Sequence, residues 1–233
     1  MELRYQQLFR RMALSGLAVS LIPLYLVGAA IYVYFASTQD QNHRAQLNAL
    51  AVNRSNAVQL FLAERTAMLE ALVHTATLDG LTSPGELKSV LSILNRRQHS
   101  FVDLGIVDAT GEHLAYEGPY PLEDRNYGDE AWFDETILRG VFVSDVFLGF
   151  RRVPHFVIAV RRADSTEPWI LRATIDSEVF TRLVRSGQVG LTGDAYIVNR
   201  DGLYQTPPRF GGEILSRAPF DTSIAPPGVN VLT

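Results

Sequence analysis

A long run of apolar positions dominates the beginning of the chain. From Met12 to Gln39 there are 28 consecutive residues without a charge, most of them Leu, Ile, Val, Ala, Tyr or Phe. A helix needs about 20 apolar residues to cross the hydrocarbon core of a bilayer. The pattern therefore predicts a transmembrane helix over residues 12–39, after a short N-terminal segment, residues 1–11.

A cleaved secretory signal peptide is the alternative, because it also begins with basic residues, and Arg4, Arg10 and Arg11 precede this run. The run exceeds the roughly 7 to 15 apolar residues of a signal peptide, and no convincing small-x-small cleavage site follows it. We therefore interpret it as an uncleaved anchor. Only Arg44 and Arg54 lie just beyond the run. The positive-inside rule then places the N-terminus in the cytoplasm and the rest of the chain outside the inner (plasma) membrane.

The next stretch of the chain lacks helix-breaking residues. No Gly or Pro occurs from Ala29 to Asp79, a run of 51 residues. Apolar residues recur there at spacings of three, four or seven, at Leu47, Ala51, Val58, Phe61, Met68 and Leu72. This spacing predicts one long stalk helix over residues 40–80. Its apolar stripe can pack along its own domain or against a second copy of the chain, and both alternatives stay open.

A second, shorter helix is predicted from Ser83 to about Gln98. Ser83, Pro84 and Glu86 are typical of a helix start, because they supply a capping serine, a proline at the first position and the acid of a capping box. Four apolar residues then follow the i, i+3, i+4, i+7 pattern of an amphipathic helix: Leu87, Val90, Leu91 and Leu94.

Beyond residue 100 the period of the pattern changes from 3.6 to 2. Five strands are predicted, over residues 101–108, 112–116, 141–148, 155–162 and 169–176. Two helices are predicted between and after them, over residues 129–139, closed by Gly140, and over residues 177–186, closed by Gly187. Short, turn-rich connections make the last three strands antiparallel neighbours. The fold class is α+β, with a transmembrane helix, a long helix and a five-stranded antiparallel sheet with flanking helices.

The last part of the chain begins a second module. A further hairpin is predicted from residues 194–198 and 203–206, and a Pro- and Gly-rich tail follows it. The predicted organisation is therefore an anchor, a stalk, a complete module over residues 81–187 and an incomplete module over residues 188–233.

Composition and charge narrow the possible functions. The chain is 47% hydrophobic and 20% charged, which excludes a disordered protein. From Asp40 onward there are 18 basic and 24 acidic residues, a net charge of −6. Such a surface offers no general attraction for nucleic acid. The chain has no cysteine, which suits an oxidising compartment.

The sequence contains no recognisable catalytic motif. The five histidines are scattered without metal-ligand spacing, and no phosphate-binding loop, nucleophile elbow or ATP-binding kinase domain is visible. We therefore expect no catalytic residue, no metal site and no cofactor in this chain. Whether the full-length protein is an enzyme, for example a histidine kinase, is left open.

The order of elements and several phrases resemble the double Cache sensor domains of bacterial transmembrane receptors, which contain PAS-like modules. The phrases lie at residues 127–133 (YGDEAWF), 144–147 (SDVF), 154–156 (PHF), 175–177 (IDS) and 190–202 (GLTGDAYIVNRDG). The resemblance covers roughly residues 1–206, and the assembly is most similar to the sensor half of a two-component histidine kinase.

This resemblance implies a ligand pocket in the membrane-distal module, between the sheet and the segment that precedes its third strand. Family members often bind a carboxylate or an amino acid there. On this sequence the pocket residues would be Tyr127, Trp132, Phe133, Ser144, Phe147, His155, Arg172 and Asp176.

The chain departs from the amino-acid-binding members of the family. Those members carry an arginine two residues before the tryptophan, where this chain has Glu130. They also tend to have a Tyr and an Asp near the end of the third strand, where Phe147 and Gly149 stand here. Asp176, which would receive an ammonium group, is retained. The usual clamp for an α-carboxylate is therefore not supported.

Arginine is the side chain best suited to bind a small anion, because its planar fork matches a carboxylate. The candidates are Arg125, Arg151, Arg152 and Arg172. Arg151 and Arg152 lie in a turn, where we expect solvated side chains. Arg172 lies on a strand, and a period of two alone does not decide which face of the sheet it occupies.

Each of the other candidate side chains also has a structural interpretation. Trp132 and Phe133 are as consistent with a core as with a ligand platform. His155 can bind an anion or sense pH, or it can be a hydrogen-bonded structural histidine.

The functional hypothesis is an extracytoplasmic ligand-sensing region of a membrane-bound signal-transduction receptor, a two-component sensor histidine kinase whose kinase domain lies outside this chain. The expected partners are a small-molecule ligand (a carboxylate or another small metabolite), the membrane and a second copy bound through the long helix, with no nucleic acid. Two alternatives stay open: the sensor of a chemoreceptor or a diguanylate cyclase, and an anchored extracytoplasmic scaffold without a small ligand.

Overall fold

The computed structural model describes residues 2–164, 167–185, 193–219 and 228. The chain divides into two compact units, one ending at Ala49 and one extending from Leu50 to Asn230. Helix α1 (Glu2–Thr75) contributes to both of them.

The first unit contains the apolar segment. Residues Arg10–Phe35 form 26 helical residues with a mean hydropathy of 2.0, which is long and apolar enough to cross a membrane by length and composition. Pro23 lies inside the helix, as membrane-spanning helices tolerate. The large apolar side chains described in this segment, from Met12 to Phe35, are all exposed in the isolated chain.

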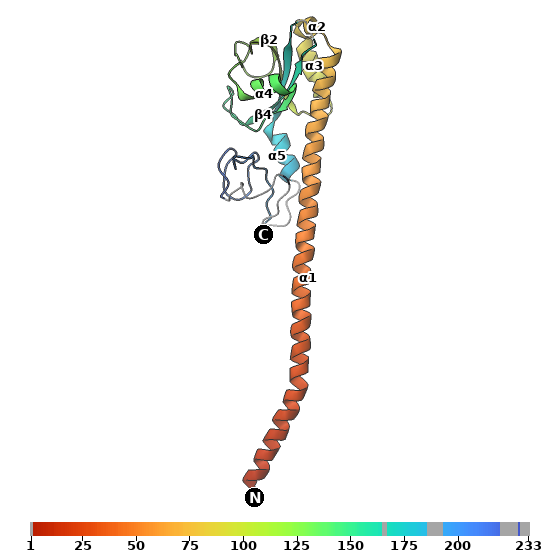
Figure 1. Ribbon diagram of the computed structural model, residues 1–233, viewed down its shortest axis with the longest axis vertical. Coiled ribbons are helices and arrows are strands. Elements are labelled where there is room, and N and C mark those ends of the chain that lie inside the picture. Colours follow the sequence, from red (N-terminus) through yellow and green to blue (C-terminus); the bar gives the residue numbers. More distant parts are fainter. Residues whose placement is uncertain (1, 165–166, 186–192, 220–227, 229–233) are drawn as a thin grey trace. The chain divides into compact units, whose positions relative to one another are not determined.

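The second unit is an antiparallel sheet with helices on both faces (Figure 1). Its strands are β1 (Phe101–Asp108), β2 (His113–Glu117), β3 (Val141–Val143), β4 (His155–Arg162) and β5 (Trp169–Asp176), in the spatial order β2-β1-β5-β4-β3. Its helices, after the end of α1, are α2 (Leu78–Thr82), α3 (Glu86–Leu94), α4 (Ala131–Arg139) and α5 (Ser177–Arg185). The predicted α+β class and the five-stranded antiparallel sheet are confirmed.

Strand periodicity separates two apolar cores. On β5, Trp169, Leu171, Ala173 and Ile175 face the larger core, to which α1, α2, α3 and α5 contribute. The intervening Ile170 faces the smaller core beneath α4, together with residues of β1 and β4. Both faces of the central strands are therefore covered, and their apolar runs are nearly continuous.

Several element boundaries differ from the sequence-based prediction. The predicted stalk helix over residues 40–80 is interrupted, because α1 ends at Thr75 and α2 follows as a separate helix. Helix α3 begins at Glu86 after Gly85, which has a φ of 82° and takes the capping position that the prediction gave to Ser83. Helix α4 begins at Ala131, two residues later than predicted.

The predicted third strand is much shorter than expected. Strand β3 ends at Val143, and residues 144–154 form a loop held by one isolated bridge between Phe147 and His155. The predicted second hairpin is likewise reduced to an isolated bridge between Val198 and Tyr204. The predicted cap at Gly187 and the first residues of the phrase at 190–202 lie outside the described residues.

Candidate ligand-binding site

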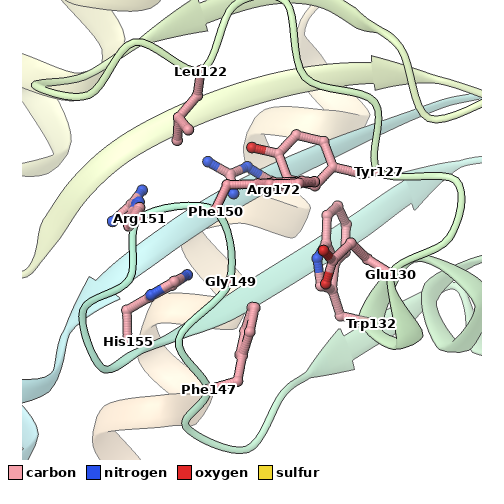
Figure 2. A pocket seen from close by; sticks show the side chains of 10 residues that line it. All are labelled: Leu122, Tyr127, Glu130, Trp132, Phe147, Gly149, Phe150, Arg151, His155 and Arg172. Carbon is pink, nitrogen blue, oxygen red and sulfur yellow. The ribbon is translucent and has the colours of Figure 1, made fainter.

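A small pocket opens on the α4 face of the sheet, with about 220 Å³ of space free of atoms, including the part that is open to solvent. Its walls come from β4, β5, α4, the segment before α4 and the loop between β3 and β4 (Figure 2). The lining residues are Leu122, Tyr127, Glu130, Trp132, Phe147, Gly149, Phe150, Arg151, His155 and Arg172. The part enclosed by the walls has room for about one water molecule, whereas ordinary ligand pockets measure roughly 300–1,000 Å³. A ligand therefore fits only if the walls move apart.

Arg172 reaches the pocket because of its place in the strand. It alternates with Leu171 and Ala173, whose side chains face the larger core, so its own side chain points to the opposite face. Its register partner on β1 is Gly105. A Cβ at this glycine would lie 3.2 Å from Arg172 Nε and 2.8 Å from His113 Nε2. Glycine at position 105 therefore makes room for the guanidinium.

A buried cluster of charges forms the floor of the pocket. Asp103 is fully buried and accepts a hydrogen bond from Arg172 Nη2 at 3.0 Å and another from the Tyr116 hydroxyl at 3.1 Å. Arg151 forms a second ion pair with the Asp103 carboxylate and donates to Thr174 Oγ1 at 2.7 Å. Two guanidinium groups thus share one buried carboxylate.

The position of Arg151 corrects the expectation that this side chain is solvated. Its side chain is only 2% exposed, whereas the neighbouring Arg152 is exposed. The turn from Gly149 to Arg152 is closed by a hydrogen bond from Arg152 N to Gly149 O at 3.3 Å, and both end residues have left-handed φ values, 50° and 56°. This geometry turns Arg151 into the pocket and Arg152 away from it.

Aromatic rings form the wall opposite the charges. The Tyr127 ring lies 5.3 Å from the Trp132 ring and 5.4 Å from the Phe150 ring, measured between centroids. The Arg172 guanidinium lies 4.8 Å from the centroid of Tyr127, within the range of a cation–π contact. The pocket therefore combines a cationic floor with a flat aromatic wall.

Several polar atoms around the pocket are buried and have no hydrogen-bond partner among the described residues. They are His113 Nε2, Tyr127 Oη, Trp132 Nε1, Arg151 Nε and Arg172 Nε. A buried polar group without a partner costs about 1–3 kcal/mol. A ligand or a water molecule that supplied acceptors to the arginine and indole N–H groups, or a donor to His113 Nε2, whose ring bonds Leu122 O through Nδ1, would recover part of this free energy.

Burial and like charge lower the pKa values of the basic groups in the pocket. Desolvation, with a smaller contribution from Arg172, lowers the pKa of Arg151. Desolvation lowers the pKa of His155 to about 4, and the positive charges of Arg151 and Arg172 act in the same direction. His155 is therefore neutral at pH 7, and its Nδ1 donates to Val153 O at 2.8 Å.

The structure brings five of the eight predicted site residues together: Tyr127, Trp132, Phe147, His155 and Arg172 line the pocket.

The remaining three predicted residues lie beside the pocket. Phe133 packs in the core beneath α4. Ser144 Oγ accepts from Val157 N at 2.9 Å and holds the loop to β4. Asp176 Oδ1 accepts from Glu178 N at 2.8 Å and caps the start of α5. A role for these residues in ligand binding stays a prediction.

The prediction missed Asp103, Leu122 and Phe150. Asp103 had a usable pattern, because it is a lone acid between apolar residues of a strand that is buried on both faces. Leu122 and Phe150 belong to loops whose course follows from tertiary contacts, so no local pattern pointed to them. Among the residues that the structure describes, no group of three or more His, Asp or Glu side chains could hold a metal ion.

No protein-family model matches the chain, and no curated protein matches it significantly. Solved structures do match in fold. The extracellular domain of the putative histidine kinase rpHK1S-Z16 aligns with a TM-score of 0.61 and 18% identity, over 78% of this chain and 76% of that domain.

Two chemoreceptor domains align less closely. The ligand-binding domain of Campylobacter jejuni Tlp3, solved with 4-methylisoleucine, gives a TM-score of 0.53 and 16% identity over 70% of this chain and 69% of its own. The ligand-binding domain of Pseudomonas aeruginosa PAO1 PctB, solved with L-Gln, gives a TM-score of 0.52 and 14% identity over 69% of this chain and 66% of its own. The chain therefore has the fold of extracellular sensor domains from histidine kinases and chemoreceptors, as the Cache resemblance implied.

Proposed function

We propose that this chain is the membrane-anchored, extracytoplasmic sensing region of a signal-transduction receptor, and that its ligand is a small molecule bound in the pocket between Arg172 and Trp132. The observation that carries the proposal is a pocket with buried polar atoms that have no partner among the described residues, in a fold shared with sensor domains that were solved with bound ligands. The apolar segment Arg10–Phe35 supports the anchor.

The output of the receptor is a separate part of the proposal. The match to rpHK1S-Z16 has the highest TM-score of those described above and favours a two-component histidine kinase, whereas the chemoreceptor matches support a chemotaxis receptor. A ligand can shift the receptor between two states only by its difference in affinity for them. The pocket must therefore differ between the signalling states.

We also propose a homodimer through α1. The stripe predicted from the sequence is largely used inside the chain, because Val58 and Phe61 are buried in its own core. A second stripe remains exposed, however, and its successive spacings of four, four, three, four and four residues keep it on one side of the helix. It consists of Val52, Asn56, Leu60, Ala63, Ala67 and Ala71.

A binding screen tests the sensor proposal. The full chain in detergent is titrated with small carboxylates, amines and sugars, and binding is followed by thermal shift. We expect at least one compound to stabilise the protein and Trp132→Ala to abolish the effect, because this side chain forms the pocket wall. Leu138→Ala is the matched control, since Leu138 lies on the same helix and is 80% exposed.

The same experiment can support the alternative, an anchored scaffold without a small ligand. That is the conclusion if no compound stabilises a folded chain and Trp132→Ala changes no response of the intact receptor.

A further inference from the structure

A buried arginine interrupts the apolar stripe that α1 packs into the larger core. Arg65 is 2% exposed, and it lies between Phe61 and Leu69, which both belong to that core. Its guanidinium lies 4.8 Å from the centroid of the Phe61 ring and 5.9 Å from that of Phe101 on β1. An apolar side chain would fill this place without the cost of burying a charge. The hydrogen bonds of the guanidinium show what the charge adds.

The partners of Arg65 include two side chains just before β1. Its Nε donates to Ser100 Oγ at 2.8 Å, and its Nη2 donates to Gln98 Oε1. The carboxylate of the preceding residue, Glu64, lies 3.3 Å from Nη1, but that side chain is 52% exposed. The buried contacts of Arg65 are therefore made with neutral acceptors, and they join α1 to the segment that leads into the sheet.

That segment is itself fixed to the sheet. Asn95 Oδ1 accepts from Ser100 N at 3.2 Å and from Phe101 N at 3.1 Å, and Asn95 Nδ2 donates to Phe101 O at 2.8 Å. Ser100 is 1% exposed, and its carbonyl oxygen accepts from Asp176 N, at the end of β5, at 3.1 Å. Ser100 thus contacts α1, β1 and β5 at one end of the sheet.

A second arginine holds the end of α1. Arg162 is the last residue of β4, two positions after Val160 of the larger core, so its side chain points to the same face of the sheet. Its Nη1 donates to Val73 O in the last turn of α1 and to Ala76 O at 3.4 Å. The last carbonyls of a helix have no partner within it, and a cation is favourable there. Arg65 and Val73 are about 12 Å apart along the helix axis, taking 1.5 Å per residue.

We propose that Arg65 and Arg162 are positioning residues, which fix the register of α1 along the sheet and make residues 65–75 move with the sheet as one body. Sliding α1 by one turn, about 5.4 Å, would put an apolar residue of the stripe in the place of Arg65. The apolar contacts would change little, but the guanidinium would leave its acceptors and stay buried without them, which is strongly unfavourable. A single polar residue in an apolar stripe fixes the register of coiled-coil helices in the same way.

This inference goes beyond the proposed sensing function and does not depend on a ligand. The two arginines lie on the face of the sheet opposite the pocket. Strands β1 and β5 nevertheless also carry Asp103 and Arg172 of the pocket floor. A displacement of these strands would therefore pass to α1 through Ser100 and Arg65, and α1 would move with the sheet rather than slide along it.

Distances between spin labels test the register. The natural chain has no cysteine, so Gln59→Cys on α1 is labelled together with Lys88→Cys on α3 or with Leu138→Cys on α4, all at exposed positions. Pulsed electron paramagnetic resonance then gives the distance for each pair in the full 233-residue chain in detergent. We expect one narrow distance for each pair when both arginines are present.

The double variant Arg65→Met/Arg162→Met removes both charges and keeps flexible apolar side chains of similar length. We expect it to fold, because buried ionic groups can often be replaced by apolar ones without loss of stability. Its label distances should broaden or shift by several ångströms, up to about one helical turn, 5.4 Å. Arg97→Met, at an exposed arginine near the same loop, is the control and should leave both distances unchanged. If the folded double variant keeps both original distances, apolar packing alone sets the register and the proposal is wrong.

A second measurement decides the question if the double variant does not fold. Ser100→Ala leaves a buried guanidinium N–H without an acceptor, so it should lower the urea midpoint of the natural chain. It should have little effect in the Arg65→Met chain, where that bond is already absent. Equal effects in the two backgrounds would overturn the role of Arg65. A ligand screen without any binding compound would contradict the sensing function and leave these results unchanged.

Discussion

His155 lies where its charge is hard to accommodate. Its side chain is 4% exposed, its ring packs 4.6 Å from the Phe147 ring, and Arg151 and Arg172 add positive potential. Desolvation is the largest cause that lowers its pKa from 6.5 to about 4. The folded domain thus holds this histidine neutral over a pH range in which the unfolded chain protonates it.

The consequence is a loss of stability at acid pH. Because the unfolded state binds the proton first, the free energy of unfolding falls as the pH drops from about 6.5 towards 4, and His155 has no effect above that range. At pH 5 the loss is about 2 kcal/mol, taking 1.36 kcal/mol per pKa unit. His155→Gln removes this term, so urea unfolding at pH 7.5 and pH 5.0 should show a smaller acid loss in the variant.

Other groups also titrate in this range, so the wild type and the variant are compared at each pH. Burial likewise lowers the pKa of His113, which leaves some acid loss in the His155→Gln protein. Equal losses in the two proteins would show that His155 is protonated in the folded state without cost.

At the scale of single residues, the alternation of apolar and polar positions predicted which residues of a strand share a face, but not which face of the sheet that is. It limited Arg172 to one of two sheet faces but did not choose between them, because that choice depends on which face receives α1 and which receives α4. It misplaced Arg151 because two adjacent arginines in a turn have the same composition whether they are solvated or not. The left-handed φ of Arg152 separates the two side chains, and no pattern in the sequence encodes it.

Among the elements, helix α1 shows how one amphipathic segment can serve two surfaces. Between Leu50 and Thr75, Val58, Phe61, Leu69 and Val73 are buried in the larger core. Leu60 is 70% exposed and lies on the opposite side of the helix, in the stripe that also contains Ala63 and Ala67. The periodicity in the sequence predicted a helix here but continued it five residues beyond its end at Thr75, and it could not assign each stripe to a partner.

A cysteine introduced at Leu60 tests the second stripe. The natural chain has no cysteine, so a single substitution gives one reactive thiol. If two copies pack through this stripe, Leu60→Cys should form a disulfide-linked dimer under mild oxidation, visible on a non-reducing gel. Gln59→Cys is the control, since its side chain is exposed but points about 100° away around the helix axis.

Equal cross-linking at both positions would indicate collision rather than a defined interface. No cross-linking at Leu60, with the domain folded, would contradict a dimer through this stripe.

Element boundaries were predicted least well where tertiary contacts decide them. The prediction continued the third strand to Leu148, because apolar residues alternate to that point. The structure ends it at Val143, and Val146 N donates instead to Gln205 Oε1 at 2.6 Å. A partner 59 residues away along the chain therefore ends the strand and shapes the loop that carries Arg151.

At the scale of the second unit as a whole, hydrogen bonds join the β3–β4 loop of the pocket directly to the segment after α5. Asn199 donates to Asp145 at 3.1 Å, and Gln205 accepts from Val146, the residue next to pocket-lining Phe147. These bonds give the loop two sets of neighbours, one in the pocket and one in the segment 193–219. A ligand that holds the loop closed would therefore also affect the packing of that segment.

The location of the unit relative to the membrane is the last property that the proposal requires. If Arg10–Phe35 is an uncleaved anchor with its N-terminus in the cytoplasm, Leu138→Cys should react with a membrane-impermeant maleimide in intact spheroplasts, because Leu138 is 80% exposed. Gln6→Cys, before the apolar segment, should react only after the cells are permeabilised. The opposite labelling pattern would reverse the orientation. If a signal peptidase removes the segment, the labelled Leu138→Cys protein runs at a reduced mass, and the mature Gln6→Cys protein carries no label because residue 6 has been removed. One gel therefore distinguishes an anchor from a cleaved signal peptide.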